Sequence, residues 1–270
     1  MASFTKFSVI PRPIFPIFQY SIIPAGAKSR MPHLTTNMPV YLLPDELIFP
    51  SPQLARKEGL LAVGGDLSQE RLLLAYRMGI FPWYSEDEPI MWWSPDPRLV
   101  LYPSEFRVSR SLKKTIRKQM FKLTVDEAFE SVINACAHSR TEADEGTWIV
   151  EEMIAAYCRL HESGLAHSVE VWQDGKLVGG LYGVSLGKCF FGESMFTNIS
   201  NASKVALVAL VEHLQVLEFD FIDCQISTPH LISFGAREIP RTRFLRELKQ
   251  ALKSPTLKGK WSFSTPFSSD

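Results

Sequence analysis

Several signatures that assign a function quickly are missing from this sequence. Its 270 residues include only four cysteines, Cys136, Cys158, Cys189 and Cys224, and none of them forms a CxxC pair. Scattered cysteines argue against a zinc ribbon or a disulfide framework and suggest a reducing compartment. The six histidines form no HExxH motif, and no apolar run reaches the roughly 18–20 residues of a membrane helix. We therefore expect a cytoplasmic protein with no metal site and no membrane partner.

The chain also lacks net charge, since 29 lysines and arginines balance 29 aspartates and glutamates. Any polyanionic partner such as nucleic acid must then be bound by a local basic patch. The composition is 46% hydrophobic and 21% charged, which is ordinary for a globular protein. The length allows one large domain or two modest ones.

The first 37 residues differ from the rest because they contain no acidic residue and because prolines interrupt their short apolar runs. A secretory signal would need an unbroken apolar region, which is missing. A transit peptide fits the composition. A disordered extension, or residues upstream of a later start at Met31 or Met38, is the simpler interpretation. We expect an extension over 1–37, a small N-terminal domain over 38–97 and a larger domain over 98–264.

A block rich in tryptophan and proline runs from Gly79 to Arg98. It contains Trp83, Trp92, Trp93 and four prolines, a density that excludes a helix interior or a central strand. Two interpretations fit, a structural plug between two domains or an aromatic wall for a ligand. Just before this block, the pattern predicts a helix over Gln69–Met78 that Asp66 or Ser68 caps and Gly79 ends. Its apolar positions Leu72, Leu73 and Tyr76 fit one helical face.

A second helix is predicted over Ser109–Met120, with Leu112, Ile116 and Met120 on its apolar arc. The opposite arc is entirely basic and consists of Arg110, Lys113, Lys114, Arg117 and Lys118. Solvated helix faces usually mix signs for i,i+4 pairing, so an unmixed stripe suggests an external polyanion. Phosphate binding and a plain solvated face both fit. A further basic cluster, Arg237, Arg241, Arg243 and Arg246, lies near the C-terminus.

From His167 onward the pattern becomes that of strands. HSVEVW, LVGGLYGVSL and CFFGESMF are separated by the turns DGK and GK, which predicts an antiparallel three-strand meander. A helix over Ala202–Leu217 and the strand FDFIDCQIS follow. Helices, a meander, a helix and a strand predict an α+β domain around a mostly antiparallel sheet.

Strand alternation places the polar residues of these segments. In FDFIDCQIS, Asp223 and Gln225 share one face, while Cys224 faces the core and is a poor candidate for a nucleophile. The carboxylate and the amide either tie the sheet to a loop or form a polar site in a cleft. In FFGESMF, Glu193 and Met195 are expected on one face. Three leucines at i, i+3 and i+7 on the following helix are either core or, with Met195 and Leu181, the wall of an apolar pocket; they are Leu207, Leu210 and Leu214.

Ten blocks carry a resemblance to a known family. They are GLLAVGGDLS, LLLAYRMGIFPW, WWSPDPR, SRS, EGTW, AHSVEVW, LVGGLYGV, FGESMF, NASK and IDCQ, and they cover about residues 41 to 240 in this order. Together they resemble the leucyl/phenylalanyl-tRNA–protein transferases of the bacterial N-degron pathway. The match is highly specific, because several blocks contain tryptophan or cysteine.

The resemblance implies a fold and a reaction. The family has a small N-terminal domain and a catalytic domain similar to the GNAT (acyl-CoA N-acyltransferase) superfamily, here expected over 98–264. Its members transfer Leu, Phe or Met from aminoacyl-tRNA to a protein that begins with Arg or Lys, which marks that protein for degradation. The resemblance implies no acyl-CoA or other cofactor.

The resemblance also implies roles for individual residues. Asp223 and Gln225 match the catalytic positions, and we expect Asp223 to hold the amide of Gln225 toward the attacking amine. We expect Trp83 to stack on the terminal adenine, and Trp92 and Trp93 to lie at the domain junction. The positions similar to the family's aminoacyl-adenosine site are Trp83, Trp148, Leu181, Glu193, Ser194, Met195, Leu207, Leu210 and Leu214. The basic stripe Arg110, Lys113, Lys114, Arg117 and Lys118 resembles the tRNA-facing surface.

Two other classes of function compete with this interpretation. An acyl-CoA-dependent acetyltransferase would share the fold, but the usual Arg/Gln-x-x-Gly-x-Gly/Ala signature is missing where the helix starts at NASK. A non-catalytic RNA-binding module would need neither Asp223 nor Gln225. The family can have Phe where this chain has Leu210 and Leu214, so the sequence does not rank Leu against Phe as the transferred residue.

Overall fold

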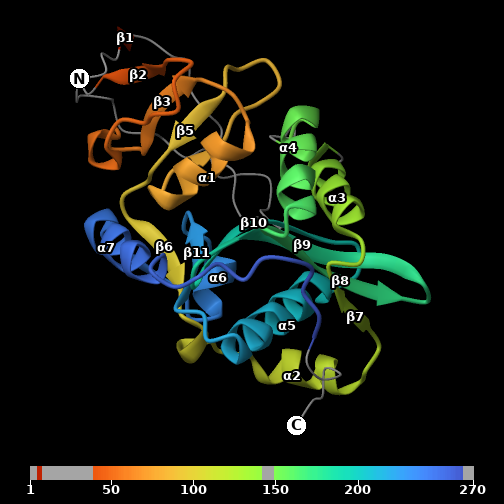
Figure 1. Cartoon of the computed structure of the whole chain (residues 1–270). Coiled ribbons are helices and arrows are strands. Elements are labelled where there is room, and N and C mark those ends of the chain that lie inside the picture. Colours follow the sequence, from red (N-terminus) through yellow and green to blue (C-terminus); the bar gives the residue numbers. More distant parts are fainter. Residues whose placement is uncertain (1–4, 8–38, 142–148, 264–270) are drawn as a thin grey trace, which may run out of the picture.

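The chain folds around two β-sheets in the computed structural model, which describes residues 5–7, 39–141 and 149–263 (Figure 1). The first sheet has the order β1 (Thr5–Phe7), β2 (Val40–Leu43), β3 (Leu60–Gly64), β5 (Met91–Trp93) and β4 (Phe81–Pro82). The second has the order β12 (Arg237–Ile239), β6 (Arg98–Leu101), β11 (Phe221–Gln225), β10 (Cys189–Thr197), β9 (Lys176–Leu186), β8 (Ala166–Gln173) and β7 (Lys122–Val125). The chain passes from one sheet to the other between β5 and β6.

Helix α1 (Gln69–Arg77) follows β3 in the first sheet, as the sequence predicted. The Ser68 hydroxyl accepts a hydrogen bond from the Arg71 amide at 3.3 Å and caps the helix. Gly79 follows with a φ of +72°, a conformation that glycine adopts without strain. A Cβ at Gly79 would lie 2.6 Å from Leu245 of helix α7 (Arg241–Ala251). Glycine is therefore needed here for the close packing of the two parts of the chain as well as for the turn.

The tryptophan-rich block forms β4 and β5 of the first sheet, and β5 pairs with a strand on each side. The expectation that its prolines exclude a central strand was therefore wrong, because the prolines lie outside β5. Trp92 and Trp93 are buried, and their indole N–H groups donate to the carbonyl oxygens of Gly64 and Trp83 at 2.8 Å. The Trp83 and Trp93 rings lie 5.1 Å apart, and Phe49 meets Trp92 edge to face. Trp92 and Trp93 are thus core residues of the first sheet, in a cluster that continues to α3 and α4. Their expected place at the domain junction stays a prediction.

The second sheet confirms the predicted meander, since β8, β9 and β10 pair antiparallel in sequence order. Strand β11 pairs parallel with β10 and antiparallel with β6, so the α+β class and the mostly antiparallel sheet are confirmed. The β10–β11 pairing ends at Phe191 and Asp223. Both strands continue beyond that point, and their separation creates a polar gap in the middle of the sheet.

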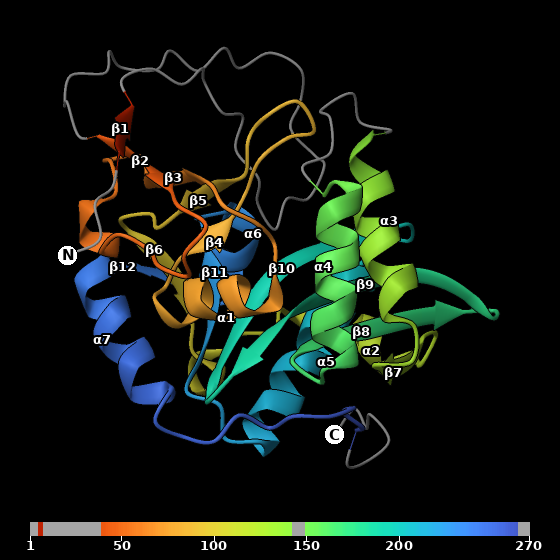
Figure 2. The same ribbon diagram turned by 45° about the horizontal axis from the view of Figure 1, so that its top comes forward.

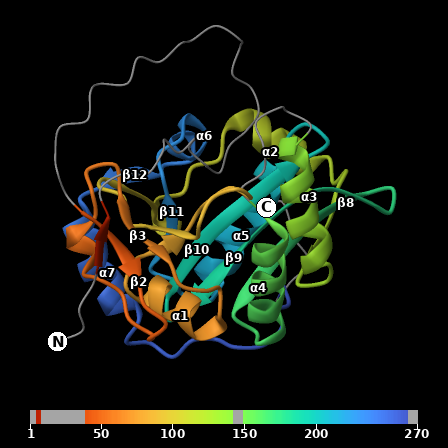
Figure 3. The ribbon, with the colours of Figure 1, turned by 90° about the horizontal axis from the view of Figure 1, so that it is seen from above.

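Helices cover the two faces of the second sheet differently (Figures 2 and 3). One face packs against α3 (Phe129–Thr141), α4 (Glu151–Glu162) and α1, in an apolar core continuous with that of the first sheet. The other face packs against α5 (Ala202–Val216), with α2 (Arg110–Arg117) and α6 (Pro229–Ser233) nearby. Short 3₁₀ turns cover Pro52–Leu54 and Pro103–Glu105. No helix among the described residues is long and apolar enough to span a membrane.

Helix α2 is shorter than predicted. Ser109 caps it by accepting from the Leu112 amide, but it ends at Arg117, and Gln119 has a φ of +49°. Met120 therefore lies beyond the helix and is exposed instead of continuing the apolar arc.

A buried ion pair joins β6 to β11. The Arg98 guanidinium donates to both oxygens of Asp223, at 2.8 and 2.7 Å, and both side chains are at most 1% exposed. Its carbon centre lies 4.8 Å from the Phe81 ring centroid and 4.5 Å from that of Phe244. Arg98 thus contacts the first sheet, the second sheet and α7 at once.

We expect Arg98→Met to lower the free energy of unfolding by about 3–5 kcal/mol, because the Asp223 carboxylate would be left buried without a cation. Chemical denaturation would measure the loss. Adding Asp223→Leu should restore most of the stability, since the uncompensated charge is then gone. Arg243→Met, which breaks the exposed pair with Glu247, is the matched control and should have little effect. An Arg98→Met protein as stable as the wild type would contradict this account.

Candidate active site

The gap between β10 and β11 contains an irregularity in each strand. On its other side, β10 shifts register with β9 between Gly192 and Ser194, and β11 shifts register with β6 between Asp223 and Gln225. Gln225 has a φ of +62°, which is uncommon for a residue other than glycine and typical of functional sites. Because of the shift in β10, Glu193 lies on the face of α1 and α4, while Met195 packs on the opposite face. The expectation that these two residues share a face was therefore wrong.

A side-chain hydrogen bond bridges the gap where backbone pairing stops. The amide nitrogen of Gln225 donates to Glu193 Oε1 at 3.0 Å. We expected Asp223 to hold this amide, but it does not. Both Asp223 oxygens accept from Arg98, and Asp223 Oδ1 also accepts from the backbone N–H of Gln225 at 3.0 Å. Asp223 thus fixes the backbone of Gln225, and Glu193 fixes its side chain. The NH₂ group of the amide faces Glu193, which leaves its carbonyl oxygen as an acceptor.

Glu193 is buried against two tyrosines from different parts of the chain. Tyr76 of α1 donates to Glu193 Oε1 at 2.8 Å, and Tyr157 of α4 donates to Oε2 at 3.0 Å. The two hydroxyl oxygens also lie 2.5 Å apart. Burial raises the pKa of both tyrosines well above 10, and the Glu193 charge raises it further. We call this three-residue arrangement the Tyr–Tyr–Glu ring.

Counting hydrogens shows what the Tyr–Tyr–Glu ring requires. It has three oxygen–oxygen contacts, and each needs one hydrogen. The tyrosines supply two, and a proton on Glu193 would supply the third, in which case one tyrosine accepts from the carboxyl while the other still donates to it. Burial raises the pKa of Glu193 to about 7, against hydrogen bonds from Tyr76, Tyr157 and Gln225 that lower it. The carboxyl therefore exchanges its proton near neutral pH, which is the range useful for catalysis.

The apolar residues of the predicted site lie together, but on the α5 side of the sheet. They belong to one buried cluster between the sheet and α5 and are Leu181, Met195, Leu207, Leu210 and Leu214. Cys224 lies in the same cluster, where burial raises the pKa of its thiol, as expected for a residue that is not a nucleophile. Ser194 is buried at the shift in β10. The polar and apolar sets thus occupy opposite faces of the sheet on either side of the gap.

One of the two tryptophans of the predicted adenosine site lies among the described residues. Trp83 is 3% exposed and packs on Trp93, so stacking on adenine stays a prediction that requires its ring to be uncovered. Trp148 lies outside the described residues.

The five cations of the basic stripe are exposed along α2 and its C-cap. Among the described residues none of them forms an ion pair, whereas Arg237 and Arg243 of the other basic cluster pair with Glu105 and Glu247. The Arg241 guanidinium is also engaged, because it donates to the Ser94 carbonyl oxygen. The stripe on α2 therefore has uncompensated charge available to a polyanion.

Sequence reasoning missed three residues of this site. Tyr76 was counted among the apolar positions of α1, and Tyr157 was not singled out, although each places a hydroxyl on Glu193. Arg98 gave a weak signal, because it is a lone charge at the start of the apolar run RLVL. A charge at such a position is costly to bury unless a partner is present, and that partner is Asp223.

Among solved structures, the likenesses are partial. L-PGS from Bacillus licheniformis is 10% identical with a TM-score of 0.37, and the match covers 74% of this chain and 66% of that one. An aminoglycoside acetyltransferase from an uncultured soil metagenomic sample is 17% identical with a TM-score of 0.32, and the match covers 43% of this chain and 88% of that one.

Proteins found by sequence are far more similar to this chain than these structures are. A family model described as leucyl/phenylalanyl-tRNA protein transferase matches residues 100–249, and the model of that family's N-terminal domain matches residues 65–96. The leucyl/phenylalanyl-tRNA–protein transferase of Desulfatibacillum aliphaticivorans is 64% identical, with 84% of this chain and 98% of that protein covered. The protein of the same name from Desulforapulum autotrophicum is 57% identical, with 84% and 99% covered. The chain therefore belongs to the leucyl/phenylalanyl-tRNA–protein transferase family.

Proposed function

We propose that this protein transfers leucine, and also phenylalanine or methionine, from aminoacyl-tRNA to the N-terminal Arg or Lys of an acceptor protein. The new N-terminal residue would mark the acceptor for degradation, and no cofactor is needed. The observation that carries the proposal is the amide of Gln225, held in the gap between β10 and β11 with its carbonyl oxygen unused by Glu193. A cytoplasmic location is part of the proposal, because aminoacyl-tRNA is present where translation occurs.

The reaction depends more on positioning the amine against the ester than on a strong catalytic base. The acceptor's α-amino nitrogen attacks the ester carbonyl, a peptide bond forms, and the ester bond breaks as the tRNA 3′ oxygen leaves and takes up a proton. An α-amino group has a pKa of about 7.7–8, so a sizeable fraction is already neutral at pH 7. Holding it against an activated ester supplies much of the rate, roughly 7–11 kcal/mol in well-oriented cases. The Gln225 carbonyl oxygen would accept a hydrogen bond from that amine.

The carboxylates would play different parts in this reaction. The Asp223 charge is compensated by Arg98, so it would act by fixing the Gln225 backbone and not by attracting the cationic acceptor. Glu193 contacts no cation among the described residues, and its partners are neutral donors. On losing its proton it would leave a negative charge beside the amide of Gln225. That charge would favour an acceptor that begins with Arg or Lys.

The remaining assignments concern binding. The apolar cluster would accept the Leu, Phe or Met side chain through the gap, and methionine in its wall would adapt to each. Its residues are Leu181, Met195, Leu207, Leu210 and Leu214. Trp83, Trp148 and Ser194 would bind the terminal adenosine, and a stacked base contributes roughly 1–3 kcal/mol. Phosphate contacts along α2 would position the tRNA without reading its sequence.

Transfer of radiolabelled leucine from Leu-tRNA tests the reaction directly. A peptide that begins with Arg should accept leucine, and one that begins with Ser should not. Gln225→Ala should lower kcat about 100-fold, the scale expected when a positioned reactant is displaced, while the thermal melting curve stays that of a folded protein. Equal transfer to both peptides, full activity of Gln225→Ala, or acetyl transfer from acetyl-CoA without tRNA would contradict the proposal.

Stability should depend on pH through Glu193. The native pKa of about 7 exceeds the unfolded value of 4.5, so the retained proton stabilises the native state fully below pH 4.5. That contribution is lost as the pH rises through 7. The unfolding free energy of the wild type minus that of Glu193→Gln should therefore fall by roughly 3 kcal/mol between pH 4 and pH 8, at about 1.4 kcal/mol per pKa unit. Denaturation at several pH values measures this, and a flat difference would refute the assignment.

Charge reversal on α2 should separate tRNA binding from chemistry. We expect Arg117→Glu with Lys118→Glu to raise KM for Leu-tRNA at least tenfold at low salt, because several phosphate contacts are replaced by repulsion. Transfer from an aminoacyl-adenosine, which has no phosphate chain, should be unaffected. Lys249→Glu with Lys253→Glu makes the same charge change at the end of α7 and serves as the control. Equal losses with both substrates would rule out this division of labour.

A further inference from the structure

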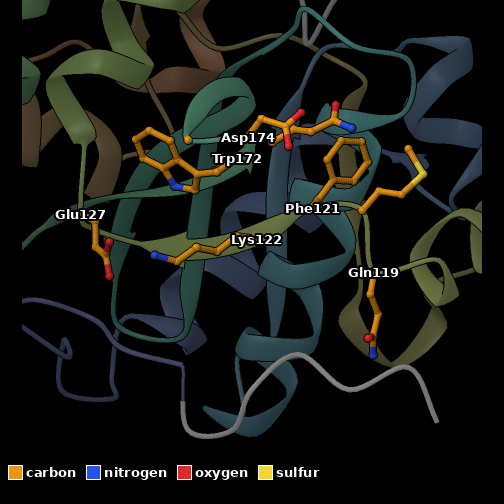
Figure 4. A pocket seen from close by; sticks show the side chains of 9 residues that line it. Gln119, Phe121, Lys122, Glu127, Trp172 and Asp174 are labelled. Carbon is orange, nitrogen blue, oxygen red and sulfur yellow. The ribbon is translucent and has the colours of Figure 1, made fainter.

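A pocket of about 500 Å³ lies at the β7 edge of the second sheet, away from the candidate active site (Figure 4). Its walls come from β7, the β8–β9 hairpin and the segment that follows α2. Trp172, Lys122 and Glu127 lie on one side of the pocket, and Phe121 and Gln119 on the other. We call it the edge pocket. None of the proposed active-site residues lines it.

Trp172 gives the edge pocket a fixed aromatic face. Its indole N–H donates to the Thr124 hydroxyl at 2.8 Å, and that hydroxyl donates to the buried carboxyl of Glu170 at 2.5 Å. The polar edge of the ring is thus satisfied inside the protein. The side chain is only partly buried, and no other aromatic ring among the described residues stacks on it. A rigid half-exposed ring of this kind is a platform on which a planar ligand can stack.

The edge pocket lies where the basic stripe of α2 ends. Lys118 caps the helix, and Gln119 and Phe121, two residues further along, line the pocket. Lys122 is the antiparallel register partner of Trp172, so both side chains project from the same face of the sheet. The five cations of the basic stripe lie just before the pocket in the chain, and a sixth, Lys122, lines it together with Trp172. The chain has no acidic residue from Arg107 to Lys122. A track of uncompensated cations that ends at an aromatic ring fits the phosphates and one base of a nucleic acid strand.

Two acidic residues at the edge pocket constrain the ligand further. Glu127 and Asp174 line it, and their carboxylates would repel a phosphate placed inside. A nucleobase with an exocyclic amino group, in contrast, can donate to a carboxylate. The charges thus favour phosphates along α2 with the base edge turned toward the acidic side chains.

We propose that the edge pocket binds one unstacked nucleotide of the tRNA, with its base on Trp172 and the adjoining phosphates on Lys122 and the end of α2. Single-stranded RNA is commonly bound in this way, by splaying out a base onto an aromatic side chain. The inference rests on the proposed function, because it takes the polyanion on α2 to be tRNA. It adds a contact remote from the aminoacyl end.

The distance from the reaction sets the expected effect. In the second sheet β8 lies three strands from β11, or about 15 Å at the usual strand spacing. A base on Trp172 therefore cannot touch the reacting ester. It should contribute to tRNA affinity, and so to KM, without changing the chemical step.

The test compares Trp172→Leu with Trp172→Phe. Trp172→Leu should raise KM for Leu-tRNA at least fivefold, the lower end of what one stacked base contributes, with kcat unchanged. Trp172→Phe keeps a ring and should recover most of that affinity. Transfer from leucyl-adenosine, which has no further nucleotide, should be the same in the wild type and in both variants. Both variants lose the hydrogen bond from Trp172 to Thr124. Thermal melting of both variants checks that this loss leaves the protein folded.

Short RNAs separate the ligand classes. Oligo(A) and oligo(C) should quench tryptophan fluorescence in the wild type more than oligo(U), whose base has no exocyclic amino group, and the difference should vanish in Trp172→Phe. KM for tRNA unchanged within twofold in Trp172→Leu would overturn the inference. So would a rise in KM for the acceptor peptide alone, because the pocket would then bind protein. If the wild type transfers leucine from neither tRNA nor leucyl-adenosine, the proposed function itself fails, and that outcome is distinguishable from the others.

Discussion

The ion pair of Arg98 with Asp223 is the constraint on which the rest of the site depends. A carboxylate at the centre of a sheet is costly to bury without a compensating charge, and Arg98 provides that charge from the neighbouring strand at 2.7–2.8 Å. With both oxygens engaged, Asp223 can also accept from the backbone N–H of Gln225. This contact accompanies the positive φ of Gln225 and the shift in β11. The backbone position of Gln225 thus follows from a charge buried two residues earlier.

The gap between β10 and β11 is the second determinant. Where the two strands stop pairing, backbone hydrogen bonds are replaced by the contact of Gln225 with Glu193, and Glu193 in turn binds Tyr76 and Tyr157. The gap places polar groups on one face of the sheet and an apolar cluster on the other. A substrate with a charged amine, an ester and an apolar side chain needs both environments side by side. Local separation of two strands places the two environments side by side in the sheet.

Much of this arrangement could be predicted from the sequence. The meander, the capped helix α1 and the strand bearing Asp223 and Gln225 follow from periodicity and turn residues, which act over a few positions. The errors came from contacts between distant residues. A register shift moved Glu193 and Met195 to opposite faces, and alternation alone does not reveal such a shift. Asp223 found its partner 125 residues away in Arg98, and nothing local indicates that pairing. Tyr76 looked like an apolar helix residue because its ring does pack in the core, and only its hydroxyl belongs to the site.

The origin of Tyr76 has a consequence for how the enzyme can be regulated or damaged. Its hydroxyl reaches Glu193 from α1, which precedes the second sheet, while Gly79 packs the end of that helix against α7. The apolar core runs without interruption from the first sheet to α3 and α4. The Tyr–Tyr–Glu ring is therefore built at the interface between the two parts of the chain. Loosening that interface would separate the Tyr76 hydroxyl from Glu193, so the ring depends on the packing of the first part of the chain as well as on the second sheet.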